Sequence, residues 1–190
     1  MTVYGIALFD LAFFVAVTVG FLVGFVQGIV RRLLGIAAVM VSFFLAANLR
    51  QPVGELFASN WTQFPPAYVE MLVFGAMFLG LFVIATIVIQ GFYDRAPVLE
   101  DAEWIDEVLG GLLGVVEVLL IVGIGILILD SFFGLASSRY DPSEFRVLRD
   151  TWDAISRSTV GSFYIQTLIP IFLGLSGALI PESLRQLLAS

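Results

Sequence analysis

The chain has 190 residues, of which 59% are hydrophobic, and its formal net charge is −7. Soluble domains are typically about 45–50% apolar, so this composition predicts a single integral membrane domain over residues 1–190. The chain contains no Cys and no His, which excludes disulfides, cysteine nucleophiles and imidazole acid–base chemistry. The excess of negative charge argues against nucleic acid as a partner.

Four apolar segments have the length that a membrane span requires, which is about 20 residues. They comprise residues 3–26, 33–49, 71–89 and 108–129. Only the short connector Gln27–Arg32 joins the first two segments, so we expect a tight antiparallel hairpin whose tip carries Arg31 and Arg32.

The next two connectors are longer and differ in character. Residues 50–70 contain Pro52, Pro65 and Pro66, and because prolines interrupt helices we expect no continuous helix there. The connector 91–107 is strongly acidic. We interpret it as a solvated loop, since nothing in it forms an oxygen cage for a cation. Two spans separate this loop from the hairpin tip, so both are expected on the same side of the membrane.

An amphipathic helix is predicted over about residues 142–157. It is preceded by Asp141 and begins with Pro142, with Glu144 three residues after the cap, which is the pattern of a helix start. Four apolar residues then recur at helical spacing: Phe145, Leu148, Trp152 and Ile155. Such a helix lies either on the membrane surface or on the protein's own loops, and the sequence leaves both alternatives open.

The last apolar block covers residues 160–180 and carries no charge, although it contains Pro170 and three glycines. These helix-weakening residues favour a re-entrant or interfacial helix over a full fifth span. The predicted fold class is therefore an all-α polytopic membrane protein. It has four transmembrane helices, an amphipathic helix, and a further apolar helix that spans or re-enters the bilayer.

Ionisable residues inside predicted spans are the first candidates for function. Glu117 lies nine residues into the fourth segment, roughly 13 Å along it. A charge near the bilayer centre costs about 2.5–3.5 kcal/mol on insertion scales, so it needs a partner, a proton or a water-filled cavity. Glu117 and Asp10 therefore mark either a proton or ion path, or a structural ion pair for Glu117 and a headgroup-facing position for Asp10. Asp130 closes the fourth segment and is interpreted as marking the water interface.

Glycines recur every four residues in two of the predicted spans. Gly20, Gly24 and Gly28 share one face of the first span, and Gly110 and Gly114 share one face of the fourth. Small residues at this spacing allow helix backbones to approach closely. They form either a homodimer face or a packing face within the monomer, and we favour the second because a four-span bundle needs such faces internally.

Three stretches carry a family resemblance. The first comprises Asp10 and the segment Gly24–Arg31, the second is Trp104–Gly114, and the third is Leu129–Gly134. In their order and spacing they resemble the colicin V production protein family of bacterial inner-membrane proteins. The resemblance implies a multi-pass protein linked to toxin production and envelope physiology, without an established catalytic mechanism.

The chain departs from the family pattern at charged positions. Gln27 stands where the family usually has Arg, Arg32 where it often has Glu, and Glu117 where it usually has Arg. Because two signs are reversed together, the comparison implies an attractive pair between Arg32 and Glu117. The glycines at 110, 111 and 114 are expected to give this pair room.

The sequence thus favours a non-enzymatic inner-membrane protein that supports bacteriocin production or export and envelope homeostasis, as a scaffold or partner-binding module. The alternative is a small oligomeric channel or ion-coupled transporter, with Asp10 and Glu117 lining a polar path. A weaker third interpretation is the membrane anchor of a larger assembly. The expected partners are the lipid bilayer and either further copies of this chain or other membrane proteins. No cofactor, metal site, Ser-His-Asp triad or nucleotide-binding loop is predicted.

Overall fold

The computed structural model describes residues 2–3, 6–92, 103–134 and 144–176. The chain begins with a short antiparallel pair of strands, β1 (Thr2–Val3) and β2 (Ile6–Ala7). The prediction that the first helix includes Val3 is therefore wrong, because α1 begins only at Leu8.

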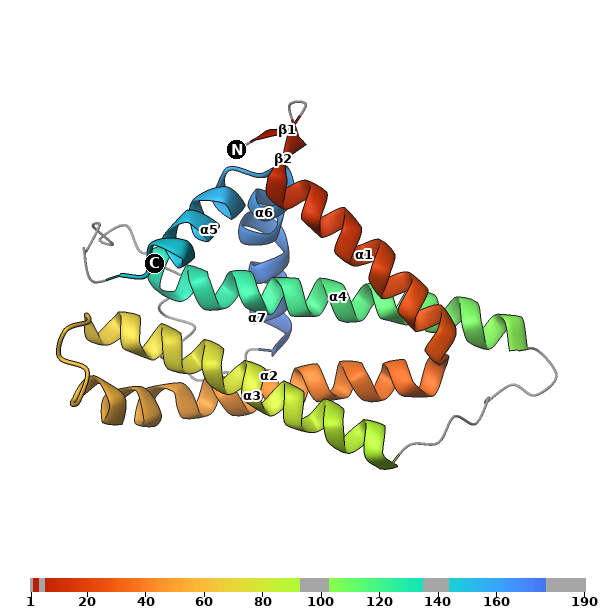
Figure 1. Cartoon of the computed structure of the whole chain (residues 1–190), viewed down its shortest axis with the longest axis horizontal. Helices are drawn as coiled ribbons and strands as arrows, with labels where there is room; N and C mark the ends of the chain where they lie inside the picture. The colour runs from red at the N-terminus through yellow and green to blue at the C-terminus, as the bar shows by residue number, and fades with distance from the viewer. Residues whose placement is uncertain (1, 4–5, 93–102, 135–143, 177–190) are drawn as a thin grey trace.

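Four long helices form the body of the protein (Figure 1). They are α1 (Leu8–Gln27), α2 (Ile29–Ala58), α3 (Pro66–Phe92) and α4 (Glu103–Phe133). Each is long and apolar enough to cross a membrane, so the predicted fold class is confirmed. Large apolar side chains are exposed on all four helices, as expected of surfaces that face lipid.

The predicted break after residue 49 is wrong. Helix α2 continues through Pro52 and ends at Ala58. A proline removes one backbone donor and crowds the carbonyl four residues earlier, and here the turns on both sides keep their helical course. Helix α3 begins at Pro66, where the missing N–H is one of the unpaired groups of a helix start in any case.

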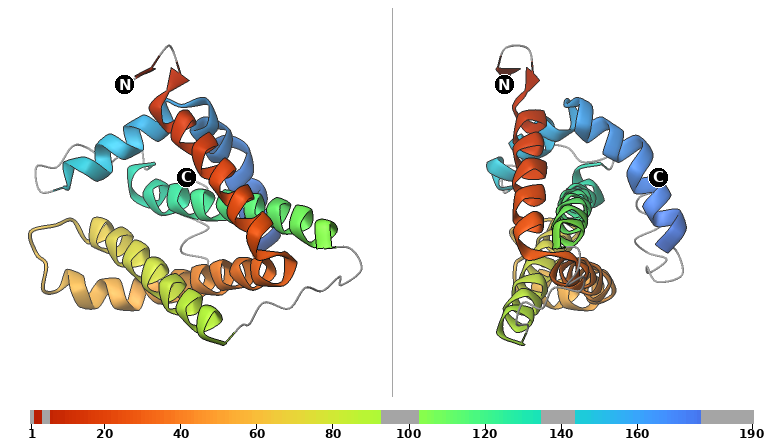
Figure 2. Two further views of the ribbon diagram at one scale, coloured as in Figure 1. Left: turned by 45° about the vertical axis from the view of Figure 1, so that its right-hand side comes forward. Right: turned by 90° about the vertical axis from the view of Figure 1, so that its right-hand side faces the viewer.

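Helix packing differs from the expected antiparallel hairpin. Gly28 alone separates α1 from α2, but the two helices diverge beyond it (Figures 1 and 2). Helix α1 packs along α4, whereas α2 packs along α3 and more lightly on α4. The turn is as tight as predicted, whereas the pairing of α1 with α2 is wrong, because the glycine face of α1 meets α4.

The remaining helices form a C-terminal limb, α5 (Arg146–Ser156), α6 (Thr159–Phe163), the π-helical turn η1 (Tyr164–Leu168) and α7 (Ile169–Ser176). The amphipathic helix begins four residues later than predicted, and the predicted cap, Asp141, lies outside the described residues. Ile155 of α5 is buried, and Leu148 and Trp152 pack against the core. The apolar face of α5 thus packs on helices of the bundle rather than on loops, and its location at the membrane surface stays a prediction.

The apolar stretch Thr159–Gly174 is shorter than the four long helices. At about 1.5 Å per residue it does not reach across a ~30 Å hydrocarbon core. Figure 2 shows α6 and α7 standing away from α4 on one side of the bundle. The last four residues of the predicted block 160–180 lie outside the described part of the chain.

The buried core lies where α2, α3, α4 and the C-terminal limb meet. Phe43, Phe74 and Leu127 come from the three long helices and are at most 1% exposed. Tyr68, near the start of α3, is also fully buried. Its hydroxyl oxygen accepts a hydrogen bond of 2.9 Å from the backbone N–H of Phe145, which fixes the position of α5 relative to α3.

Candidate functional site

An ion pair joins α2 to α4 inside the bundle. The guanidinium Nη1 of Arg32 donates to Oε2 of Glu117, and its Nη2 donates to Oε1 of Gln27 at 2.8 Å. The side chains of Arg32 and Glu117 are only 11% and 10% exposed. The contact between Arg32 and Glu117, inferred because both charges are opposite to those usual in the family, is therefore present. Gln27, which also departs from the family pattern, belongs to the same cluster.

The space for this pair comes from a glycine that the sequence did not single out. A Cβ atom added to Gly35 of α2 would lie 2.6 Å from Oε1 of Glu117. The expectation that Gly110, Gly111 and Gly114 make the room is wrong, because all three face α1. Gly35 is isolated in sequence and follows no repeat, so no pattern marked it.

A polar cavity of about 180 Å³ adjoins the ion pair. We call it the turn pocket because it lies where α1 ends and α2 begins. Its lining residues are Gln27 of α1, Arg31, Arg32 and Gly35 of α2, Phe82, Thr86 and Ile89 of α3, and Glu117 of α4.

We expected Arg31 and Arg32 at the tip of a hairpin. This is wrong, because both lie within the first turn of α2. Arg31 is half-buried. Among the described residues, no ion pair or hydrogen bond involves its side chain.

Asp10 anchors the C-terminal limb. Its carboxylate is 7% exposed and accepts hydrogen bonds from the backbone N–H groups of Thr159, at 3.2 Å, and Val160, at 3.0 Å. These N–H groups begin α6 and have no partner within the helix, and a carboxylate there is also favoured by the helix dipole. The expectation that Asp10 faces headgroups is wrong.

Asp10 and Glu117 lie apart and have different partners. Asp10 lies near the start of α1, whereas Gln27, which belongs to the Glu117 cluster through Arg32, ends that helix. The 17 residues between Asp10 and Gln27 correspond to about 25 Å of helix. Asp10 is thus joined to the start of α6, whereas Glu117, in the middle of α4, is joined to the first turn of α2.

A second carboxylate caps the turn between α1 and α2. Asp106 of α4 is 5% exposed and accepts a hydrogen bond of 3.3 Å from the backbone N–H of Ile29. Gly28 has a φ of +77°, and a Cβ atom there would collide with the Asp106 carboxylate. The sequence analysis placed Asp106 in a family motif but gave it no role. The N–H groups at the start of a helix need acceptors, but the sequence did not show that α2 begins directly after Gly28.

The five repeated glycines pack within the chain. A Cβ atom on Gly110 would lie 2.6 Å from the carbonyl oxygen of Gly24 and 2.8 Å from Cα of Gly28. Gly20 and Gly114 meet in the same way one turn further along. Backbone therefore contacts backbone between α1 and α4, which is the intramolecular alternative that the sequence favoured.

Asp130 does not end its helix. Helix α4 continues to Phe133, and the Asp130 side chain is half-buried. The expectation that it closes the fourth segment is thus wrong by three residues.

A second ion pair, which the sequence analysis missed, joins the buried Arg50 of α2 to the half-buried Glu70 of α3. Arg50 is 3% exposed, and its Nη2 lies 3.8 Å from Oε2 of Glu70. Gly54 makes room for this pair, because a Cβ atom there would lie 2.7 Å from Cγ of Glu70. Arg50 and Glu70 were assigned to a loop because Pro52 was interpreted as a helix breaker.

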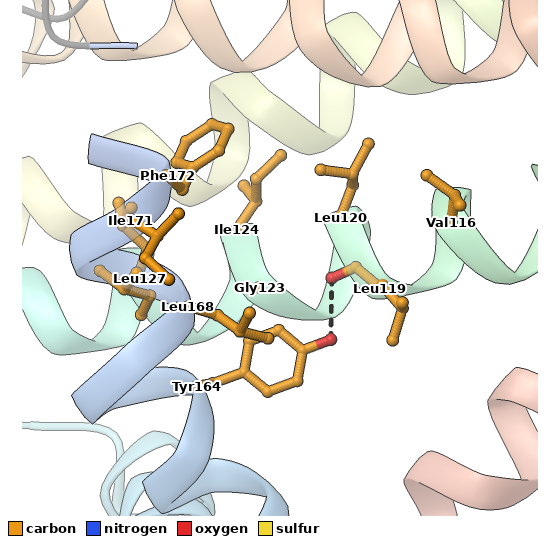
Figure 3. A pocket seen from close by; sticks show the side chains of 11 residues that line it. Val116, Leu119, Leu120, Gly123, Ile124, Leu127, Tyr164, Leu168, Ile171 and Phe172 are labelled. Atoms are coloured by element: carbon orange, nitrogen blue, oxygen red, sulfur yellow. Dashed lines mark hydrogen bonds between the residues drawn. The ribbon is translucent and has the colours of Figure 1, made fainter. Parts of the chain in front are cut away.

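An apolar crevice of about 310 Å³ separates α4 from the C-terminal limb (Figure 3). The Tyr164 ring reaches across it, and its hydroxyl donates to the carbonyl oxygen of Leu119 at 3.1 Å. The other lining residues are apolar: Val116, Leu119, Leu120, Gly123, Ile124, Leu127, Leu168, Ile169, Ile171 and Phe172. Within the described residues, no group of three or more acidic side chains could hold a metal ion.

Four long apolar helices, joined in two places by ion pairs between helices, define a polytopic α-helical membrane protein. A family model described as Colicin V production protein matches residues 9–170. The chain therefore belongs to the colicin V production protein family. No curated protein and no solved structure matches it.

Proposed function

We propose that this protein is a non-enzymatic scaffold of the bacterial inner membrane that supports bacteriocin production or export and envelope homeostasis. The proposed process, bacteriocin production or export, is based on membership of the colicin V production protein family. The observation that carries the scaffold role is the ion pair between Arg32 and Glu117, because both side chains are almost fully buried and the Glu117 carboxylate accepts from the Arg32 guanidinium.

The other buried carboxylates support the same proposal. Asp10 and Asp106 each accept a backbone hydrogen bond at a helix start, and Glu70 faces Arg50. Intramembrane charges usually mark ion pathways or proton relays. Here the carboxylates of Asp10, Asp106, Glu70 and Glu117 each join two helices. Such contacts suit a rigid platform that presents surfaces to partner proteins.

A channel or ion-coupled transporter is the second candidate, and the turn pocket is the observation that favours it. The pocket places a cavity of about 180 Å³ next to Glu117. A relay through Glu117 would require the carboxylate to leave Arg32 and take up a proton during each cycle.

Reconstitution distinguishes the two candidates. The purified protein is placed in liposomes that contain a pH-sensitive dye, and a pH step is applied with and without a potassium diffusion potential. A scaffold leaves the decay of the pH difference equal to that of empty liposomes. If the pH difference decays faster than in empty liposomes, and Glu117→Gln removes this acceleration, the scaffold proposal is contradicted and the protein is a transporter.

The process itself is tested in cells. A bacteriocin-secreting bacterium that lacks its own family member receives either this chain or an empty vector. Under our proposal the chain raises the secreted bacteriocin titre, and Glu117→Gln does so in proportion to the amount of folded protein in the membrane. An unchanged titre despite normal membrane levels of the wild-type chain contradicts the assignment.

A further inference from the structure

Arg31 carries a charge that forms no ion pair with any described residue. It lies within α2, one of the four membrane-spanning helices, and is half-buried. A guanidinium does not lose its proton in proteins, so it cannot escape the cost of burial by becoming neutral. A charge at this position therefore needs an anion or water beside it.

Two carboxylates of the described residues that lie at or beside the turn pocket already have partners. Glu117 pairs with Arg32, and Asp106 accepts from the N–H of Ile29. The residues that line the pocket thus include two guanidinium groups and one carboxylate, which leaves one positive charge in excess.

The remaining polar groups of the pocket also favour an anion. Arg32 has only donors, so its 2.8 Å hydrogen bond to Gln27 fixes the Gln27 oxygen as the acceptor. The amide NH2 of Gln27 is then left as a donor. The Thr86 hydroxyl donates its hydrogen to the carbonyl oxygen of Phe82 at 2.8 Å, so it has no donor left for an anion.

Size and surroundings narrow the class of anion. A water molecule takes up about 30 Å³ in the liquid, so a cavity of about 180 Å³ accommodates a group several times larger. The planar guanidinium fork matches the oxygens of a phosphate group in a bidentate manner. Phe82 and Ile89 line the same cavity, and the neighbouring Val83 and Ile87 are exposed where acyl chains run.

We propose that the turn pocket binds a phosphate group, with Arg31 as its main ligand and the Gln27 amide as a second donor. Two sources supply this chemistry, an anionic phospholipid headgroup and free phosphate. Basic pockets between transmembrane helices are known to hold anionic headgroups, so the lipid is the expected source. This site does not depend on the proposed scaffold function.

The test measures binding to the delipidated full-length protein in detergent, with the thermal unfolding midpoint followed by Trp fluorescence. Phosphatidylglycerol, zwitterionic phosphatidylcholine and inorganic phosphate are titrated separately. We expect phosphatidylglycerol to raise the midpoint at a concentration about tenfold lower than phosphatidylcholine does, since the fork then meets a net negative charge. A rise with inorganic phosphate alone would identify free phosphate as the source.

Two variants locate the effect. Arg31→Gln should weaken the response about tenfold, whereas Arg157→Gln, which removes the same charge from a side chain that is 81% exposed, should leave it unchanged. Thr86→Leu fills the pocket and keeps both arginines. Its matched control is Thr18→Leu, because Thr18 also bonds the carbonyl four residues earlier but is exposed.

The proposal is overturned if no titrant raises the midpoint, or if the three titrants act alike on the wild type and on Arg31→Gln. If Arg31→Gln does not fold, Thr86→Leu decides the matter, and a response equal to that of Thr18→Leu overturns the proposal as well.

Discussion

Arg32 and Glu117 are 85 residues apart in sequence and form an ion pair between the first turn of α2 and the middle of α4. Arg32 also holds Gln27, the last residue of α1. Three helices therefore meet at one guanidinium. Gly35 faces Glu117 so closely that a side chain at position 35 would collide with the Glu117 carboxylate and disturb its ion pair with Arg32.

A double-mutant cycle with glutamine measures this pair. Removing one partner of a buried pair typically costs about 3–5 kcal/mol, because the other charge stays buried without compensation. Arg32→Gln and Glu117→Gln should each lower the free energy of unfolding by about this amount, as followed by SDS titration in mixed micelles. The double variant should lose clearly less than the sum of the two. Strict additivity would show that the pair contributes no coupling energy.

The glycine face between α1 and α4 predicts a position-specific effect of leucine. Gly24→Leu inserts a side chain where a carbonyl group of Gly110 already sits, and overpacking of this kind costs about 1–3 kcal/mol or more. Val23→Leu changes a neighbouring side chain that is 38% exposed and should be nearly neutral. Equal thermal midpoints for the two variants in detergent would argue against a packed face.

Gly28 should resist even the smallest substitution. Its φ of +77° and ψ of 177° lie in a region essentially confined to glycine, where an L-residue costs about 1–3 kcal/mol, and the Asp106 carboxylate occupies the place of a Cβ atom. We expect Gly28→Ala to lower the thermal midpoint by several degrees. Gly80→Ala is the control, because nothing lies within 4 Å of a Cβ atom there and alanine favours the helix by about 1 kcal/mol. A harmless Gly28→Ala would mean that the turn relaxes freely.

The Asp10 anchor is best tested by hydrogen exchange. Asp10→Ala removes the acceptor for the N–H groups of Thr159 and Val160, and loss of a helix cap costs about 0.5–2 kcal/mol. Exchange at these two amides should accelerate, while Asp10→Asn should restore much of the protection because Asn also caps helices. Asp150→Ala, at an exposed position of α5, serves as the control. Unchanged exchange in Asp10→Ala would disprove the anchor.

The topology is open to single-cysteine labelling, because the natural chain has no Cys. The end of α3 and the start of α4 lie at the same end of the bundle as the turn between α1 and α2, and the link from α2 to α3 lies at the other end (Figure 1). Gly91→Cys and Trp104→Cys should therefore be labelled from one side of the membrane and Asn60→Cys from the other. Labelling of all three from one side would contradict the four-span topology.

Hydrophobic segment length predicted the four long helices, because a bilayer demands about 20 apolar residues whatever their order. It could not predict which helices pack together. The short link at Gly28 favoured pairing of α1 with α2, but backbone contact between Gly24 and Gly110 is available only with α4. The small-residue pattern was visible, whereas the choice of partner depends on how two such faces match in three dimensions.

The polar site was predicted only where charge gave a signal. A carboxylate in an apolar run marked Glu117, and the reversed signs pointed to Arg32. Nothing local marked Gly35, and the true partners of Asp10 are backbone groups 149 and 150 residues away, which leave no trace in side-chain composition. Arg50 and Glu70 were hidden by Pro52, because a proline in an apolar helix resembles a boundary and is tolerated when the adjoining turns are satisfied.

The long sequence separation between Asp10 and its partners sets an order of events during synthesis. Ribosomes add about 5–20 residues per second, so the N–H groups of Thr159 and Val160, 149 and 150 residues after Asp10, are made about 7–30 s after Asp10 itself. Through this interval the Asp10 carboxylate lacks the two backbone donors that it has in the folded protein. The α6 helix start is thus among the last parts of the protein to lock into place, and a ribosome that stalls before it leaves a chain whose first helix has not yet found its final partner.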